Sequence, residues 1–158
     1  MTTRERAVVA LRQALAKRSA DLVESRSGRR PEVAIRVDGR TLAQGRLSAR
    51  AAGTWQSNTD YGVANAPEDP NRFWIFVDLI PAQPAIYIAP EWFVMRDIAQ
   101  VHAGYLARND GERAVTKDST HHQISLPRIE QWRDRWDVVG FSCGSGECAV
   151  TGSNDFRA

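Results

Sequence analysis

Hydrophobic residues near the start of the chain recur first at the spacing of a helix and then at that of strands. Residues 3–24 carry apolar side chains three or four positions apart, which predicts an amphipathic helix. Residues 33–37 and 41–50 alternate between apolar and polar side chains, as strands with one buried face do. Asp38 and Gly39 between them are a strong signal for a tight hairpin turn. A helix followed by a two-stranded hairpin is therefore expected.

The middle of the chain contains its most hydrophobic segments. Residues 51–72 hold repeated Pro, Gly, Asn and Asp, so we expect a connection there. Residues 73–79 are apolar on both alternating faces, which indicates a central strand that is covered on each side. Residues 85–89 predict a second buried strand. Pro90 and Glu91 suit the first turn of a helix, because proline needs no N–H there and an acid favours the positive helix end.

The last third of the chain has shorter and more polar segments. The apolar stripe of the helix just described is expected at Val94, Ile98, Val101 and Tyr105. Residues 108–120 predict a polar loop, 121–125 a short strand and 127–136 a final short helix. Residues 141–158 are rich in Gly, Ser and Asn and are expected to form a flexible tail. The pattern predicts one mixed α/β domain over residues 1–140.

Composition narrows the class of protein. A chain of 158 residues suits a single domain with a real core. No apolar run approaches the roughly eighteen residues of a membrane span, so no membrane partner is expected. The first residues lack the apolar stretch of a secretory signal, which favours a cytoplasmic protein. Two cysteines late in the chain do not make a disulfide framework.

Charge is distributed unevenly along the chain. Residues 1–50 hold twelve Lys or Arg against five Asp or Glu, a net charge of +7, whereas residues 51–158 have a net charge of −5. Such an asymmetry predicts a basic face that binds a polyanion or an acidic partner. Nineteen of the 21 basic residues are arginine, and coding bias explains them equally well if they only fill solvated positions. Both interpretations stay open.

Five short runs then give the chain a family resemblance. They are ARAAGTWQ at 49–56, FWIFVDL at 73–79, IYIAP at 86–90, HHQI at 121–124 and RDRWD at 133–137. In order and spacing these runs resemble one branch of the PD-(D/E)XK superfamily, restriction-endonuclease-like bacterial proteins that are mostly uncharacterised. The resemblance covers about residues 30–140. It implies a restriction-endonuclease-like α/β fold, with a mixed central sheet flanked by helices and an αβββαβ core.

The resemblance also implies a chemistry, the metal-assisted hydrolysis of phosphodiesters. In the family, an Asp at a strand start and an acid on the next strand bind one or two Mg²⁺ ions. A Lys two residues beyond the second acid lies beside the attacking water. Carboxylate oxygens suit a hard cation, and the metal activates the water and stabilises charge on the phosphate. The ammonium group favours the deprotonated nucleophile.

This sequence departs from the family at the catalytic strand. Alignment back from the GTWQ run places Arg46 at the second acid and Ser48 at the lysine. The only lysines of the chain, Lys17 and Lys117, lie outside the expected sheet. A guanidinium stays protonated and spreads its donors over a plane, so arginine substitutes poorly for lysine. The strand is therefore interpreted as a degenerate copy of a catalytic one.

Few residues remain as candidates for catalysis. Asp38 and Glu32 are the only acids near the position of the first acid, so they are the candidate catalytic residues and metal ligands. Mg²⁺ would be a cofactor only if the site is active. For Asp38, a role in the turn is favoured about three to one over a role as a metal ligand. A glutamate placed like Glu32 is more commonly a solvated residue at a strand edge. Gln56 is a further candidate, since its amide suits a phosphate or a base edge.

Three functions follow from these observations. The leading interpretation is a nuclease-like domain that has lost catalysis and binds nucleic acid, DNA rather than RNA, or serves as an interaction module. The phosphate contacts would come from arginines, namely Arg29, Arg30, Arg36, Arg46 and Arg50. One alternative is an active Mg²⁺-dependent endonuclease with relocated acidic ligands. The other is a protein–protein interaction module, a homodimer formed through exposed aromatic side chains.

Overall fold

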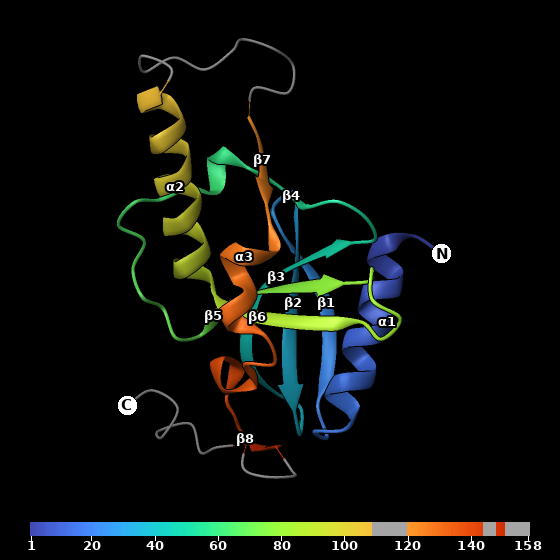
Figure 1. Ribbon diagram of the computed structural model, residues 1–158. Coiled ribbons are helices and arrows are strands. Elements are labelled where there is room, and N and C mark those ends of the chain that lie inside the picture. Colours follow the sequence, from blue (N-terminus) through green and yellow to red (C-terminus); the bar gives the residue numbers. More distant parts are fainter. Residues whose placement is uncertain (109–119, 144–147, 151–158) are drawn as a thin grey trace.

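The centre of the structure is a five-stranded sheet with helices on both of its faces (Figure 1). The computed structural model describes residues 1–108, 120–143 and 148–150. Its sheet has the order β1 (Asp21–Ser27), β2 (Arg30–Val37), β3 (Arg40–Arg50), β5 (Arg72–Asp78) and β6 (Ala85–Pro90). Neighbouring strands are antiparallel except β3 and β5, which are parallel. The chain is thus a mixed α/β protein with a mostly antiparallel sheet.

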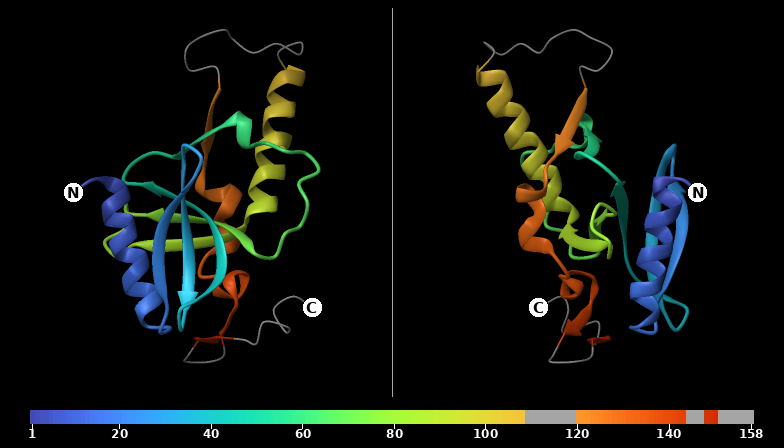
Figure 2. Two further views of the ribbon diagram at one scale, coloured as in Figure 1. Left: turned by 180° about the vertical axis from the view of Figure 1, so that it is seen from behind. Right: turned by 45° about the vertical axis from the view of Figure 1, so that its right-hand side comes forward.

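The remaining elements cover this sheet unequally. Helix α1 (Thr3–Ala16) packs on one face, and helix α2 (Glu91–Arg108) packs on the other (Figure 2). The α2 side also holds β4 (Trp55–Asn58), β7 (His121–Ile124), α3 (Leu126–Ile129) and the short helices η1 (Thr59–Tyr61) and η2 (Glu130–Trp132). The chain then passes through η3 (Trp136–Val139) to the strand pair β8 (Phe141–Cys143) and β9 (Cys148–Val150). None of the described helices combines the length and apolar character that a membrane crossing requires.

Strand β5 contributes to both hydrophobic cores, which confirms the prediction of a strand covered on each side. Phe73, Ile75 and Val77 pack in the α1 core. Trp74 and Phe76 point the opposite way and pack in the α2 core, as the alternation of a strand requires. The rings of Trp74 and Phe76 stack with their centroids 5.7 Å apart. Burying both faces of one strand places the residues of β5 and its neighbours in fixed positions.

The parallel contact between β3 and β5 depends on a glycine. A Cβ atom added to Gly45 would lie 1.8 Å from the carbonyl oxygen of Phe73. No side chain fits at that distance, so glycine alone permits the two backbones to approach. The connection between the strands, residues 51–71, contains β4 and η1 but no α-helix. The sequence predicts a connection over residues 51–72, and the strand β4 within it is an element that the sequence did not predict.

The first predicted helix is too long. Helix α1 ends at Ala16, and residues 21–24, which the sequence assigns to the same helix, belong to the strand β1. A turn separates the two elements, in which Ser19 has a left-handed φ of +55° and the N–H of Ala20 donates to the carbonyl of Leu15. Leu22 continues the apolar helical spacing of the sequence, but its side chain is buried as part of the strand β1.

Three predictions near the C-terminus also need correction. Val101 belongs to the expected buried stripe of α2 but is exposed. Residues 127–136 are expected to form one helix, but the structure breaks this segment into α3, η2 and the start of η3. The expected tail begins at residue 141, yet Phe141 is buried in the α1 core and opens strand β8. Most of the expected tail, and nearly all of the polar loop at 108–120, lie outside the described residues.

Candidate functional site

A cluster of charged side chains lies on the α2 side of the sheet. It is formed near the start of β2, in the middle of β3 and at the start of β5. Glu32 comes from β2, Arg46 from β3 and Arg72 from the start of β5. Arg46 is paired opposite Trp74 in the β3–β5 register, so it points to the same face as that buried ring. Glu91, the first residue of α2, completes the cluster. Residues distant in sequence thus meet at one position.

Two carboxylates and two guanidiniums are paired closely in this cluster. Arg72 Nη1 lies 2.5 Å from Glu32 Oε1, and Arg72 Nη2 lies 2.8 Å from Glu91 Oε2. Arg46 Nε lies 3.5 Å from the same Glu91 oxygen. The Arg46 side chain is 17% exposed and that of Arg72 is 24% exposed, whereas Glu32 is only 9% exposed. The acids are therefore enclosed, and the guanidiniums form the accessible side of the cluster.

A tyrosine connects a third guanidinium to the group. Tyr61 from η1 lies under two arginines, with Arg30 Cζ and Arg46 Cζ each 4.4 Å from the centre of its ring. Its ring meets that of Trp74 edge to face at 5.3 Å. Such contacts between a cation and a ring hold a guanidinium in position without neutralising it. We call Arg30, Glu32, Arg46, Arg72 and Glu91, together with Tyr61, the arginine cluster.

The arginine cluster carries three positive charges against two negative ones. Hydrogen bonds from Arg72 to Glu91 raise the pKa of Arg72, against the opposing effect of burial, and Glu32 acts in the same direction as Glu91. Arg72 therefore stays fully protonated at every physiological pH. Arg30 is exposed and has no carboxylate partner among the ion pairs described. The cluster thus holds one positive charge in excess, and that charge is open to solvent.

The position that the family gives to lysine is occupied by a hydroxyl with a structural role. Ser48 Oγ accepts a hydrogen bond from Trp74 Nε1 at 2.8 Å. Trp74 is almost fully buried, so its N–H needs this acceptor. Ser48 and Arg46 therefore support the tryptophan and the ion pairs around it. Nothing at these two positions resembles an acid followed by an ammonium group.

Arg50, a predicted phosphate contact, is enclosed instead. Its Nη2 lies 2.6 Å from Asp78 Oδ2, and its Nη1 donates to the carbonyl of Gly53 at 2.6 Å. The guanidinium also lies 4.1 Å from the ring centre of Trp55. Burial disfavours the charged form of Asp78, but hydrogen bonds from Arg50 and from the N–H of Ile80 outweigh it, so the pKa of Asp78 is lowered.

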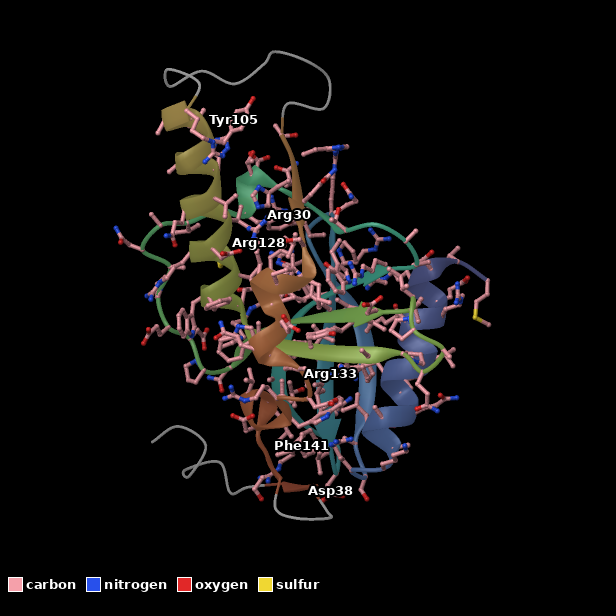
Figure 3. The ribbon with its side chains drawn as sticks, viewed as in Figure 1. Arg30, Asp38, Tyr105, Arg128, Arg133 and Phe141 are labelled. Atoms are coloured by element: carbon pink, nitrogen blue, oxygen red, sulfur yellow. The ribbon has the colours of Figure 1, made fainter. Side chains whose placement is uncertain are left out.

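Asp38 and Glu32 lie at opposite ends of β2 and do not meet. Asp38 is exposed in the β2–β3 turn, where it has a left-handed φ of +51°. Its place in that hairpin confirms the turn that the sequence predicts. Six residues of strand separate the two acids, a distance of about 20 Å. Figure 3 shows Asp38 at the end of the molecule far from Arg30, which adjoins Glu32.

Of the other predicted contacts, only Arg30 joins Arg46. Arg36 donates to the carbonyl of Gly39 in the β2–β3 turn. Arg29 is exposed in the turn between β1 and β2. Gln56 lies on β4, where its amide donates to Thr54 Oγ1 at 3.2 Å. The structure therefore brings together Arg30, Glu32 and Arg46 from the candidates and leaves the rest apart.

Three members of the cluster were missed by the sequence. Tyr61 and Arg72 belong to a segment that reads as a connection, and Glu91 reads as a helix-start residue. The available signal was the position of Arg72 directly before a fully apolar strand. A charge at the end of such a strand lies at the border of the core and needs a partner.

The donor set of the cluster does not suit the magnesium ion that the family implies. Within the described ranges, no three His, Cys, Asp or Glu side chains are grouped so as to hold a metal ion. Glu32 and Glu91 are both bound to guanidiniums, and Arg46 stands where the resemblance implies a second acidic ligand. A cation would have to compete with these fixed positive charges for the same oxygens.

Comparison of the chain with protein-family models, with curated proteins and with solved structures gives no match. The resemblance to the PD-(D/E)XK superfamily therefore remains an expectation from the sequence runs alone. What the structure contributes independently is the arginine cluster and its position on the sheet.

Proposed function

We propose that this chain is a restriction-endonuclease-like protein that binds nucleic acid, DNA in preference to RNA, without hydrolysing it. The observation that carries the proposal is the arginine cluster. It stands at the strand where the family keeps its catalytic acid and lysine, and it carries excess positive charge. The proposal thus keeps nucleic acid as the ligand, as in the family, but does not include phosphodiester hydrolysis.

The geometry of the cluster supports contact with phosphates. Arg46 and Arg72 each use some N–H groups for the enclosed acids and keep part of the guanidinium accessible. A guanidinium has five donors in a fixed plane, so one edge can bind a carboxylate while another meets a phosphate oxygen. Arg30, held over Tyr61, adds a third donor group on the same side. Such contacts fix the position of a nucleic acid backbone and carry no base preference.

The same residues argue against hydrolysis. An arginine side chain is not deprotonated in proteins, so Arg46 can neither accept a proton from water nor ligate a metal ion. Ser48 is occupied by the indole N–H of Trp74. The two acids of the cluster are neutralised by arginines. No group at this strand is available to activate a water molecule.

Fluorescence anisotropy with short labelled duplex DNA, and with RNA of the same sequence, tests the proposal. We expect binding whose log K falls linearly with log salt, with a slope of about −0.9 for each phosphate contacted. The variants Arg30→Ala and Arg46→Ala should each reduce the slope by about one contact. Arg40→Ala is the matched control, since Arg40 is equally cationic and exposed at the β2–β3 turn.

Two results would contradict the proposal. Binding that is absent at low salt, or that Arg40→Ala weakens as much as Arg46→Ala, would show that the arginine cluster is not the contact surface. Cleavage of the same DNA with Mg²⁺ or Mn²⁺, abolished by Glu32→Ala, would establish instead an active endonuclease with relocated ligands.

A further inference from the structure

The five-stranded sheet has one open edge, at β1. Within the described part of the chain, β1 pairs only with β2. The opposite edge strand, β6, is covered, because Tyr87 forms a bridge to Arg133 and the N–H of Asp134 donates to the carbonyl of Ile86. Every residue of β1 except Leu22 is exposed. An uncovered edge of this length is a template for pairing with another strand.

The backbone groups on that edge can be assigned. Ser27 and Arg30 close a two-residue turn, so they form a hydrogen-bonded pair, and every second residue of β1 bonds to β2 in the same way. The residues between them, which are Leu22, Glu24 and Arg26, therefore direct their N–H and C=O groups outward. Arg12 Nη2 donates to the carbonyl of Leu22 at 3.3 Å, which agrees with this assignment. The outward backbone N–H and C=O groups of Glu24 and Arg26 remain for pairing with another strand.

We propose that a second copy of this chain pairs with β1 through its own β1, antiparallel, so that one sheet continues across a homodimer. In three of the two-fold symmetric registers, Glu24 lies opposite one of the three residues with outward groups. Glu24 lies opposite its own copy in the first, opposite Leu22 in the second and opposite Arg26 in the third. Only the third register places an acid opposite a base, Glu24 opposite Arg26. The two-fold symmetry forms this pair twice.

The position of α1 favours the same register. In the third register the pairing is centred on Ser25, whereas in the second it is centred on Val23, closer to the carbonyl of Leu22 that Arg12 already occupies. The part of β1 beyond Glu24 is left free for the partner strand. The register centred on Ser25 is therefore favoured both by the opposite charges that it pairs and by the accessibility of the strand beyond Glu24.

The surface beside the edge has room for the partner's side chains. A hollow of about 360 Å³ is lined by residues that include Glu24, Arg26 and Arg4. A second hollow of about 570 Å³ lies between α1 and Glu24, and Val9 and Met1 form part of its lining. Val9 is 44% exposed although it belongs to a helix of the core. Among the described residues, no aromatic side chain lines either hollow, so this interface differs from the aromatic one that the sequence suggests for a homodimer.

Sedimentation velocity of the full chain tests the proposal. We expect a species of about twice 17.6 kDa for the natural sequence. Arg26→Glu places Glu opposite Glu, and Glu24→Arg places Arg opposite Arg, so each variant alone should sediment as a monomer. Mixed in equal amounts, the two variants regain both opposite-charge pairs and should form a heterodimer. Arg40→Glu, the same charge change at the exposed β2–β3 turn, should leave the dimer intact.

Each other outcome overturns the proposal. A natural chain that is monomeric at all concentrations has no such interface. A dimer that survives Arg26→Glu uses a different surface. Two monomeric variants that stay monomeric when mixed, while their circular dichroism matches that of the natural chain, would exclude the register in which Glu24 faces Arg26.

Discussion

Strand β3 carries two arginines, Arg46 and Arg50, on the same face of the sheet, but they have different surroundings. Arg50 is matched by a single acid, Asp78, and the pair is closed off by Trp55, with side-chain exposures of 10% and 4%. Arg46, four residues earlier, shares Glu91 with Arg72 and lies at an opening where Arg30 adds a further charge. Arg50 belongs to a neutral, enclosed ion pair, and Arg46 belongs to a cationic, accessible cluster.

The difference shows what decides the role of an arginine on a strand. Residue type, strand and face are the same for Arg46 and Arg50, so none of them distinguishes the two. What differs is the number of acids for each guanidinium, which is one for Arg50 and two shared among Arg30, Arg46 and Arg72. An enclosed pair contributes to folding and keeps its donors away from solvent, whereas a surplus of guanidiniums keeps accessible donors for a ligand.

The largest expected effect comes from breaking the enclosed pair. Asp78→Asn leaves the Arg50 charge without its partner at a site with little access to water, so we expect a loss of about 3–5 kcal/mol in the free energy of unfolding. The control is Asp137→Asn, which breaks the exposed pair with Arg135 and should cost less than about 1 kcal/mol. Urea denaturation measures both. Equal losses would mean that Asp78 is not enclosed.

Ser48 lies between the two arginines, and its removal should cost less. In Ser48→Ala the buried N–H of Trp74 loses its acceptor, so we expect a loss of about 1–3 kcal/mol. Ser48→Thr keeps the hydroxyl and is the matched control. Urea denaturation followed by tryptophan fluorescence reports both. A loss in the threonine variant as large as in the alanine variant would point to packing and not to the hydrogen bond.

Nucleic acid binding should separate Arg46 from Arg50 more finely. Arg46→Ala should weaken binding about tenfold at low salt, the effect of losing one charged hydrogen bond, and should reduce the salt slope by about 0.9. Arg50→Ala should lower the midpoint of urea unfolding but leave the slope unchanged. Anisotropy titrations at a temperature where both variants are folded provide the measurement. A reduced slope in Arg50→Ala would remove the distinction between Arg46 and Arg50.

The smallest effect is the acid dependence of the enclosed pair. Because the pKa of Asp78 is lowered in the folded state, its contribution to stability is complete above the ordinary Asp pKa of about 3.9. That contribution is lost as the pH falls from there through the folded-state value. Urea midpoints between neutral and acidic pH should therefore fall more steeply for the natural chain than for Asp78→Asn. Parallel curves would show that Asp78 titrates normally.

Much of the fold could be predicted from the sequence, and the errors have identifiable causes. The hairpin at Asp38-Gly39, the strand at 73–79 and the start of α2 follow from local signals that tertiary contacts reinforce. The helix at 3–24 fails because Leu22 fits a helical spacing and is buried equally well from a strand. Phe141 reads as part of a polar tail, since nothing in its neighbours shows that it reaches the α1 core.

The candidate site was only half predictable. Arg30, Glu32 and Arg46 lie on or near the strand that the resemblance singles out, so the sequence offered them as candidates. Arg72 and Glu91 reach the same place only because β5 lies parallel to β3 and α2 starts where β6 ends. Pairings between distant segments leave no periodic pattern in the sequence. The enclosure of Arg50 depends on Asp78 across the same parallel pair and was equally hidden.

The parallel pairing of β3 and β5 also has a consequence for the order of folding. Strands β1, β2 and β3 are joined by two-residue turns and can associate rapidly through local contacts. Strand β5 can pair with β3 only when the loop of residues 51–71 closes. Closing this loop costs conformational entropy before the contacts between the two strands can stabilise the structure. We expect the meander to form early and the docking of β5 to limit the rate. Both arginine sites therefore come into existence together, at the final step.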